Sequence, residues 1–389
     1  MDTAHGPVAW RNWRAFDPGN NPASGVEVLL CSDAPVTGEL TEGLGPYQLL
    51  NALAPLASAS VGAPPAVVVR ATYAIVFRPS LKGAEDVTDE SRYHGGDMFD
   101  ELAALLSLSL GIRCRSAGRT RIWEEPGTDG DALGRPVYFD VEHPYLPRND
   151  RGQSIPRLAR VVAIADAAPL LQRYARLNAG HAVAVLRAAR LYQHAVWIAD
   201  DDPSQAWVQL VSALETAADA EHLKLAGPLD RIREAWPELA AVLDRVGDEA
   251  DAVARIVAPV IKSKAKFLAF MAQFAPGPPD ERPYAWAQVD WARLPEYLGR
   301  IYGYRSRALH AGTPFPVPMC EPARSFDDGV PIERPHGLST WAHDAVWNAD
   351  DAPMLLSTFE HITRGALTAW WAQLPQDASA DRPADDRES

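Results

Sequence analysis

The chain has 389 residues, of which 47% are hydrophobic and 23% are charged, and this composition excludes an intrinsically disordered protein. A single hydrophobic core rarely grows beyond about 250–300 residues, so the length predicts two domains. The net charge of −14 excludes nucleic-acid binding through bulk charge. Any contact with phosphate groups would therefore require a local basic patch.

The three cysteines, Cys31, Cys114 and Cys320, are widely spaced and form no C-x-x-C pair. This spacing argues against a disulfide scaffold and a Cys-rich zinc site, and it favours the reducing cytoplasm. The N-terminus lacks the pattern of a signal peptide, and no apolar run approaches the roughly 18–20 residues of a membrane span. We therefore expect a cytoplasmic protein with no membrane contact.

Residues 1–150 are predicted to form a mixed α/β domain with a sensor or regulatory role. Strands are predicted over residues 26–31, 66–77, 112–123 and 135–141, and a helix over residues 98–110. The polar, Pro-bearing segment 144–156 has no periodicity and predicts the domain boundary.

Residues 157–375 show the helical period and are predicted to form an all-α bundle, which gives an α+β fold class with two domains. Helices are predicted over residues 167–177, 182–198, 204–222, 239–257, 259–274 and 290–310, and residues 339–374 close the bundle. The acidic segment 376–389 is predicted to be disordered.

The predicted helix 290–310 carries an arginine on its apolar side. At about 100° per residue, Arg305 falls on the same stripe as Leu298, Tyr302 and Leu309, whereas Arg307 lies on the opposite, solvent side. An arginine on a buried stripe is costly unless it is paired or lines a site or an interface.

A second stripe on this helix contains Gly299, Gly303, Ser306 and His310. The small residues would leave a groove, and the helix dipole favours a protonated histidine in the last turn. An arginine that holds a phosphate and a histidine that moves a proton suit the cleavage of a phosphodiester.

The segment IYGYRSRALHAG, residues 301–312, resembles the R-x4-6-H motif of HEPN domains, with Arg305 and His310 as its arginine and histidine. The likeness is greatest to the ApeA-like HEPN group. That group has an upstream helix with an A-L-E core, which Ala213, Leu214 and Glu215 match, and an aromatic-x-x-basic-small-basic run before His-x-Gly. The resemblance covers roughly residues 160–375.

The resemblance implies an all-α domain that forms a homodimer, so that two motifs face one composite cleft. Many such proteins are endoribonucleases of phage-defence or toxin–antitoxin systems that need no metal or other cofactor. By this resemblance Arg305, His310 and Ser306 would be the catalytic residues, RNA the substrate, and a regulatory protein or a phage-derived activator a further partner. Active members often have Asn, Asp or His where this chain has Ser306.

The local charge of one segment also favours a polyanion as the binding partner. Residues 259–310 contain eight basic and four acidic side chains, a net charge of +4 that leaves −18 for the rest of the chain. Lys262, Lys266, Arg300 and Arg307 are the predicted RNA-binding residues within this segment.

Each of these assignments has a structural alternative. Arg305 could form a buried ion pair with Glu215, with His310 capping the helix, and the lysine run at 262–266 could be a solvated helix face. The sequence therefore leaves three hypotheses open: a ribonuclease, an inactive HEPN module that binds RNA, a nucleotide or a protein, and a structural helical adaptor.

Two other segments also have plain interpretations. Asp140, Glu142 and His143 contain metal-ligating atoms, but polar residues at a strand end before a proline turn are far commoner, so no metal site is predicted. The glycine-containing segment 127–134 lacks the following Lys-Ser/Thr of a P-loop and is interpreted as a turn.

Overall fold

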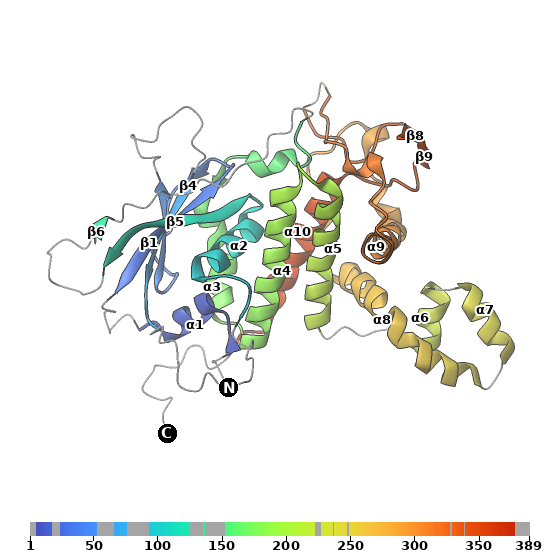
Figure 1. Ribbon diagram of the computed structural model, residues 1–389, viewed down its shortest axis with the longest axis horizontal. Helices are drawn as coiled ribbons and strands as arrows, with labels where there is room; N and C mark the ends of the chain where they lie inside the picture. The colour runs from blue at the N-terminus through green and yellow to red at the C-terminus, as the bar shows by residue number, and fades with distance from the viewer. Residues whose placement is uncertain are drawn as a thin grey trace. The chain divides into compact units, whose positions relative to one another are not determined.

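The computed structural model describes residues 5–17, 24–52, 66–75, 93–123, 135–136, 152–221, 227–235, 237–246, 249–326, 329–337 and 339–377. The chain has a mixed α/β fold (Figure 1). It divides into two compact units. The first unit comprises Met1–Pro147, Pro156–Trp197 and Trp371–Ser389, and the second comprises Arg148–Ile155 and Ile198–Trp370.

An antiparallel sheet forms the centre of the first unit. Its strand order is β3-β4-β1-β5-β6, and every neighbouring pair is antiparallel. The bounds are Gly25–Ser32 for β1, Tyr47–Ala52 for β3, Ala66–Thr72 for β4, Cys114–Trp123 for β5 and Arg135–Pro136 for β6. Every residue of β1 is buried, and β1 has a strand on each side. A short parallel pair joins β2 (Val36–Thr37) to β7 (Val162–Ala163).

Helix α2 (Met98–Leu110) begins and ends where the sequence predicts, for two local reasons. Asp97 accepts hydrogen bonds from the backbone N–H groups of Phe99 and Asp100, and the Asp100 carboxylate accepts one from the N–H of Asp97, which completes a capping box. Gly111 ends the helix at a φ of 66°, a left-handed conformation that glycine adopts without strain.

Helix α1 (Val8–Ala15) depends on a carboxylate from another helix. Its N-cap residue is Pro7, which makes no side-chain cap, and the buried Glu101 of α2 accepts hydrogen bonds from the backbone nitrogens of Val8 at 3.1 Å and Ala9 at 2.6 Å. Burial nevertheless outweighs these bonds and raises the pKa of Glu101 to about 7.

This raised pKa predicts a pH-dependent stability. The ionised form of Glu101 is disfavoured in the folded state, so the free energy of unfolding should fall as pH rises from about 4.5 to about 7. In Glu101→Gln this fall should be absent, so that the variant gains about 3 kcal/mol relative to the wild type over that interval. Urea unfolding at a series of pH values measures the gain, with Glu42→Gln at an exposed site as the control. A constant difference between variant and wild type across this range would contradict the prediction.

The helices α3 (Ala168–Ala175) and α4 (Ala179–Ile198) follow the expected boundary, yet they pack in the first unit. The indole Nε1 of Trp10 donates to the carbonyl of Leu177 at 3.1 Å, and Nε of Arg113 donates to the carbonyl of Val196 at 2.7 Å. These hydrogen bonds tie α1 and the start of β5 to residues more than 80 positions away. The compact units therefore divide the chain differently from the predicted ranges 1–150 and 157–375.

The predicted strands agree with β1, β4 and β5, although β4 ends at Thr72. Residues 76–77 and 137–141 of two predicted strands lie outside the described residues, as do the segment 127–134, the candidate ligands Asp140, Glu142 and His143, and the tail from residue 378 onward. The sequence patterns did not predict β3 and α1, which are short and are stabilised by partners distant in the chain.

Helices dominate the second unit. Their bounds are Pro203–Ala220 for α5, Pro228–Ala235 for α6, Pro237–Val246 for α7, Ala250–Phe274 for α8, Leu294–Ala311 for α9 and Leu356–Gln373 for α10, the last extending beyond this unit at Trp371. Helices α5, α8 and α9 pack against one another. Trp207 of α5 stacks on Phe359 of α10, and Phe270 of α8 packs edge-on to Trp370 of α10.

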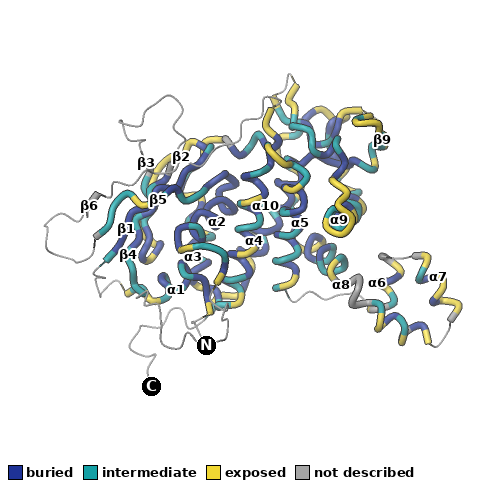
Figure 2. The backbone as a smooth tube through the Cα atoms, in the orientation of Figure 1, coloured by how far each residue is buried: buried dark blue, intermediate teal, exposed yellow. Residues whose placement is uncertain are grey.

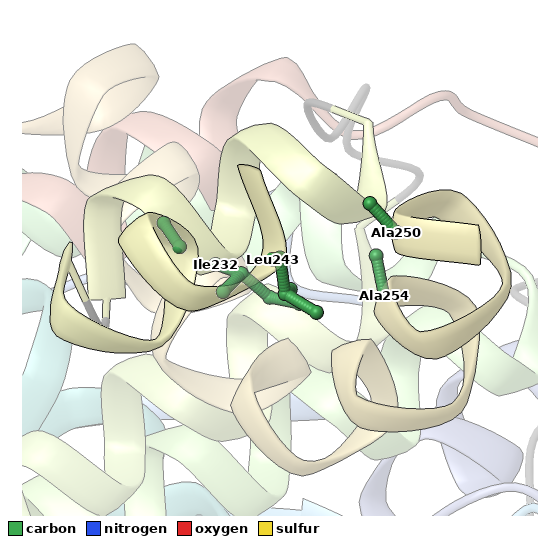
Figure 3. Close-up of a cluster of buried hydrophobic side chains, with 5 residues drawn as sticks. Ile232, Leu243, Ala250 and Ala254 are labelled. Carbon is green, nitrogen blue, oxygen red and sulfur yellow. The ribbon is translucent and has the colours of Figure 1, made fainter. Parts of the chain in front are cut away.

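A small separate core lies at one end of this unit. Ile232 of α6, Leu243 of α7 and Ala254 of α8 form a buried cluster with Ala240 and Ala250 (Figure 3). The outer sides of α6 and α7 are exposed (Figure 2). The first turns of α8 thus pack with α6 and α7, whereas its last turns pack with α5, α9 and α10.

Two expectations for this part of the chain are wrong. One helix, α8, continues through Pro259, where the sequence analysis separated two helices. Proline removes one helical hydrogen bond, but packing on both sides of it holds the helix together. The second unit is also not all-α, because β8 (Ser339–Ala342) and β9 (Ala345–Asn348) form an antiparallel hairpin. Both turn residues, His343 and Asp344, have positive φ, as a two-residue type I′ turn requires.

Candidate functional site

Helix α9 carries the motif and has well-defined ends. Asp290 accepts a hydrogen bond from the backbone nitrogen of Ala292 just before the helix, and Pro295 lies in its first turn. Gly312 ends it with a φ of 64°. The predicted helix through His310 is therefore confirmed.

Arg305 projects from α9 toward α5, where it forms an ion pair between its Nη2 and Oε2 of Glu215. The Arg305 side chain is 19% exposed and that of Glu215 is 14% exposed, so both groups are largely but not fully removed from water. Glu215 is the predicted structural partner of Arg305, and the structure places the two side chains in contact. The Nε of Arg305 is buried and has no hydrogen-bond partner among the described residues.

The ion pair lies on the wall of a polar pocket of about 320 Å³ between α5, α8 and α9. The lining contains two cationic, two anionic and three hydroxyl side chains, together with one alanine. These residues are Ser212, Glu215, Thr216, Ala218 and Asp219 of α5, Ser263 and Lys266 of α8, and Arg305 of α9. Nζ of Lys266 lies 2.6 Å from Oδ1 of Asp219, so the pocket contains a second ion pair.

Burial raises the pKa of two groups beside the pocket. Removal from water raises the pKa of Glu215, and nearby Asp219 raises it further, while the charge of Arg305 and a hydrogen bond with Tyr302 oppose the rise. Burial and the negative charge of Glu215 also raise the pKa of the Tyr302 phenol. Tyr302 shares a further side-chain hydrogen bond with Ser263, so it links Glu215 to α8.

We expect Arg305→Ala to destabilise the protein, because it leaves the Glu215 carboxylate partly buried without its cation. The free energy of unfolding should fall by about 1–3 kcal/mol, and the loss should shrink as the pH is lowered from 8, because protonation of Glu215, whose pKa burial raises, removes the unpaired charge. Urea unfolding measures the loss. Arg307→Ala on the exposed side of α9 is the matched control and should cost less than about 1 kcal/mol. Equal losses in the two variants would contradict the structural role of the pair.

His310 lies in the last turn of α9 and is exposed, and Ser306 is half-buried. The predicted apolar stripe is only partly buried, because Leu309 at its C-terminal end is 50% exposed whereas Leu298 is 3% exposed. The expectation that Arg305 lies in the middle of a buried stripe is therefore wrong. The stripe is buried at Leu298 and exposed at Leu309, and Arg305 lies between these two residues.

The structure pairs two of the four predicted RNA-binding side chains with acids. Lys266 contacts Asp219, and Arg300 contacts Glu296 at 2.9 Å and Asp351 at 2.7 Å. Asp219 and Asp351 come from outside the basic segment 259–310, so the local charge surplus that the sequence shows is largely neutralised in the fold. Of the other two predicted residues, Arg307 is exposed and lies over the Tyr304 ring, and Lys262 belongs to α8, with its side chain outside the described part.

Gly299 and Gly303 do not provide close helix packing within the described structure. A Cβ atom at either position would meet no atom within 4 Å. The small-residue stripe of α9 therefore borders open space in the described part of the chain and makes no close backbone contact there.

The α5 wall of the pocket was not predicted from the sequence. Ser212, Glu215, Thr216 and Asp219 recur at three- and four-residue spacing along a helix that is otherwise apolar, and this pattern marks one polar face. The pairing of that face with Lys266 and Arg305 could not be predicted, because it depends on how α5, α8 and α9 pack.

Among the described residues, no group of three or more His, Cys, Asp or Glu side chains is arranged to hold a metal ion. Within the same part of the chain, no helix combines the length and apolarity needed to cross a bilayer. Comparison with known proteins gives no match to a family model, to a curated protein or to a solved structure.

Proposed function

We propose that the second unit is a HEPN-like module and that the protein is a metal-independent endoribonuclease that acts as a homodimer. The observation that carries this proposal is the placement of Arg305 and His310 on α9. The Arg305 guanidinium lines an open polar pocket, and the His310 imidazole is exposed five residues later, so both groups are accessible to a ligand.

In the proposed reaction, Arg305 donates hydrogen bonds to a non-bridging oxygen of the scissile phosphate. The 2′-hydroxyl attacks the phosphorus and loses its proton, while the 5′-oxygen leaves and gains one. The products are a 2′,3′-cyclic phosphate and a 5′-hydroxyl. His310 transfers a proton in one of these steps, and Ser306 donates a hydrogen bond to the phosphate.

A homodimer solves a geometric difficulty of this assignment. Residues five apart on a regular helix project about 140° apart, so Arg305 and His310 of one α9 point to different sides. A second copy would bring its own histidine to the arginine side of the first. The open stripe at Gly299 and Gly303 supports a close approach of another helix, because no atom of the described chain occupies it.

The first unit would then act as a sensor or regulator, and a regulatory protein or a phage-derived activator would activate the nuclease. In this proposal the protein belongs to a phage-defence or toxin–antitoxin-like system in the cytoplasm. This part of the proposal rests on the resemblance of residues 301–312 to the HEPN motif.

A second candidate function is binding of RNA, a nucleotide or a protein without cleavage. Three observations favour it: Arg305 is already paired with Glu215, the cations Lys266 and Arg300 are paired with acids, and Ser306 stands where active HEPN proteins often have Asn, Asp or His. A purely structural role for Arg305 is less well supported, because a core ion pair does not require a pocket beside it.

The test is incubation of the purified chain with a mixed RNA pool in excess EDTA, followed by analysis of product ends. Fragments with cyclic phosphate ends that depend on both Arg305 and His310 would support the nuclease. Intact RNA, together with retained RNA binding in an electrophoretic shift assay, would support the binding module instead. The molar mass in solution, from light scattering, tests the homodimer separately.

A further inference from the structure

We propose that the pocket between α5, α8 and α9 binds one ribose-phosphate unit and recognises its 2′-hydroxyl. This inference deepens the proposed function, on which its link to RNA rests, by naming the part of the substrate that the pocket takes. The ligand chemistry is that of a sugar hydroxyl beside a phosphate, supplied either by an RNA backbone or by a free ribonucleotide.

The cations provide the phosphate site. Lys266 uses one of its three ammonium protons on Asp219, and Arg305 uses Nη2 on Glu215 while its buried Nε lacks a partner among the described residues. Both side chains line the pocket, and both have donors beyond those used in these ion pairs. Charge-assisted hydrogen bonds from guanidinium and ammonium groups to phosphate are among the stronger polar contacts in proteins.

The α5 wall provides acceptors for a sugar hydroxyl. The hydroxyl of Ser212 donates its proton to the carbonyl of Val208 at 2.8 Å, and that of Thr216 donates to the carbonyl of Ser212 at 2.9 Å. Both oxygens thus present lone pairs, not protons, to the pocket. A ligand that donates a hydroxyl proton fits this wall, and the carboxylates of Glu215 and Asp219 add further acceptors.

The size and lining of the pocket favour the sugar and phosphate over the base. Its volume of about 320 Å³ is at the lower end of the roughly 300–1,000 Å³ of small-molecule sites. None of its eight lining residues is aromatic, so those side chains offer no ring on which a base could stack. One ribose-phosphate unit matches this volume and this lining better than a whole dinucleotide.

Isothermal titration calorimetry of the full chain with uridine 3′-monophosphate tests this proposal. We expect binding at the pocket, at least threefold weaker binding of 2′-deoxyuridine 3′-monophosphate, and at least tenfold weaker binding to Lys266→Met. Lys264→Met is the matched control on α8, since Lys264 does not line the pocket, and it should bind like the wild type. Thr216→Val, which removes one acceptor, should reduce the preference for the 2′-hydroxyl.

Equal affinity for the ribo and deoxy nucleotides, or equal affinity of Lys266→Met and Lys264→Met in folded protein, would overturn the inference. A circular dichroism spectrum of each variant establishes that it is folded. A single-stranded RNA that competes with the nucleotide identifies RNA as the source of the ligand, whereas a nucleotide that RNA does not displace identifies a free ribonucleotide.

These experiments test the proposed nuclease activity and the proposed ligand of the pocket independently. Binding of the ribonucleotide without RNA cleavage would contradict the proposed activity and leave the pocket assignment intact. Cleavage that is unchanged in Lys266→Met, with no ribonucleotide binding in any variant, would contradict the pocket assignment and leave the activity intact.

Discussion

His310→Ala is expected to slow RNA cleavage in EDTA by about 10²–10⁴-fold, the range typical of a lost general acid or base. The His310 side chain is exposed in the last turn of α9, so its removal should leave the free energy of unfolding within about 0.5 kcal/mol of the wild type. The rate of appearance of cyclic phosphate ends, measured beside urea unfolding of the same preparation, separates catalysis from stability.

A histidine elsewhere in the second unit provides the control. His343 is exposed in the turn between β8 and β9, and asparagine tolerates its positive φ of 48°. His343→Asn should cleave RNA at the wild-type rate. If His310→Ala also retained the wild-type rate, its assignment as a proton-transfer residue would be wrong, and the binding module would become the better hypothesis.

Trp207→Ala is expected to lower the free energy of unfolding by about 3–5 kcal/mol, the cost of removing a large aromatic side chain from a core. The Trp207 side chain is fully buried and stacks on Phe315 at 5.2 Å and on Phe359 at 4.6 Å between ring centroids. Its Nε1 also donates to the carbonyl of Met319 at 3.2 Å, so one indole connects α5, α10 and the loop after α9.

Chemical unfolding monitored by far-UV circular dichroism measures this loss, and Trp286→Ala is the matched control. Trp286 is 49% exposed and contacts Phe326 and His336 at the surface, so its removal should cost less than about 1 kcal/mol. A loss of similar size in both variants would show that Trp207 is not the aromatic centre of this unit. Because α5 also carries Glu215, Trp207→Ala should lower ribonucleotide affinity as well.

The paired cations change how the basic segment 259–310 should be interpreted. Arg282 forms a two-point contact with the buried Glu333, and Arg293 contacts both Glu296 and Asp350. Together with the pairs of Lys266, Arg300 and Arg305, five of the eight basic side chains in this segment have an acidic partner. RNA binding over a broad positive surface is thus disfavoured, whereas a compact phosphate site in the pocket is consistent with the structure.

Local sequence signals determined most of the regular elements. The capping box at Asp97 and the glycine at position 111 set the ends of α2, and the mainly apolar run of residues 26–31, which contains Glu27, predicted the central strand β1. These features depend on hydrogen bonds and side-chain spacing within a few residues, so they can be read without a tertiary structure. The helical period over residues 167–198 was equally clear.

Elements whose stability comes from distant partners were not predicted correctly. The hairpin of β8 and β9 turns at His343 and Asp344, a pair that lacks the usual asparagine–glycine signal. Helix α8 passes through Pro259, which ordinarily ends a helix, because separate cores hold its two halves. Both features form because the free energy of tertiary packing exceeds the local conformational preferences of the residues.

For the site, the sequence by itself determined that Arg305 and His310 share one helix and that Glu215 could be the partner of Arg305. Only the tertiary structure decided that the arginine and this glutamate meet on the wall of a pocket, and that Lys266 and Asp219 form a second pair there. The physical reason is that an ion pair forms between side chains that are close in the folded structure, whatever their separation in the sequence. Helical spacing fixes which side of α9 a residue faces, but the packing of α5 and α8 fixes which charge it meets.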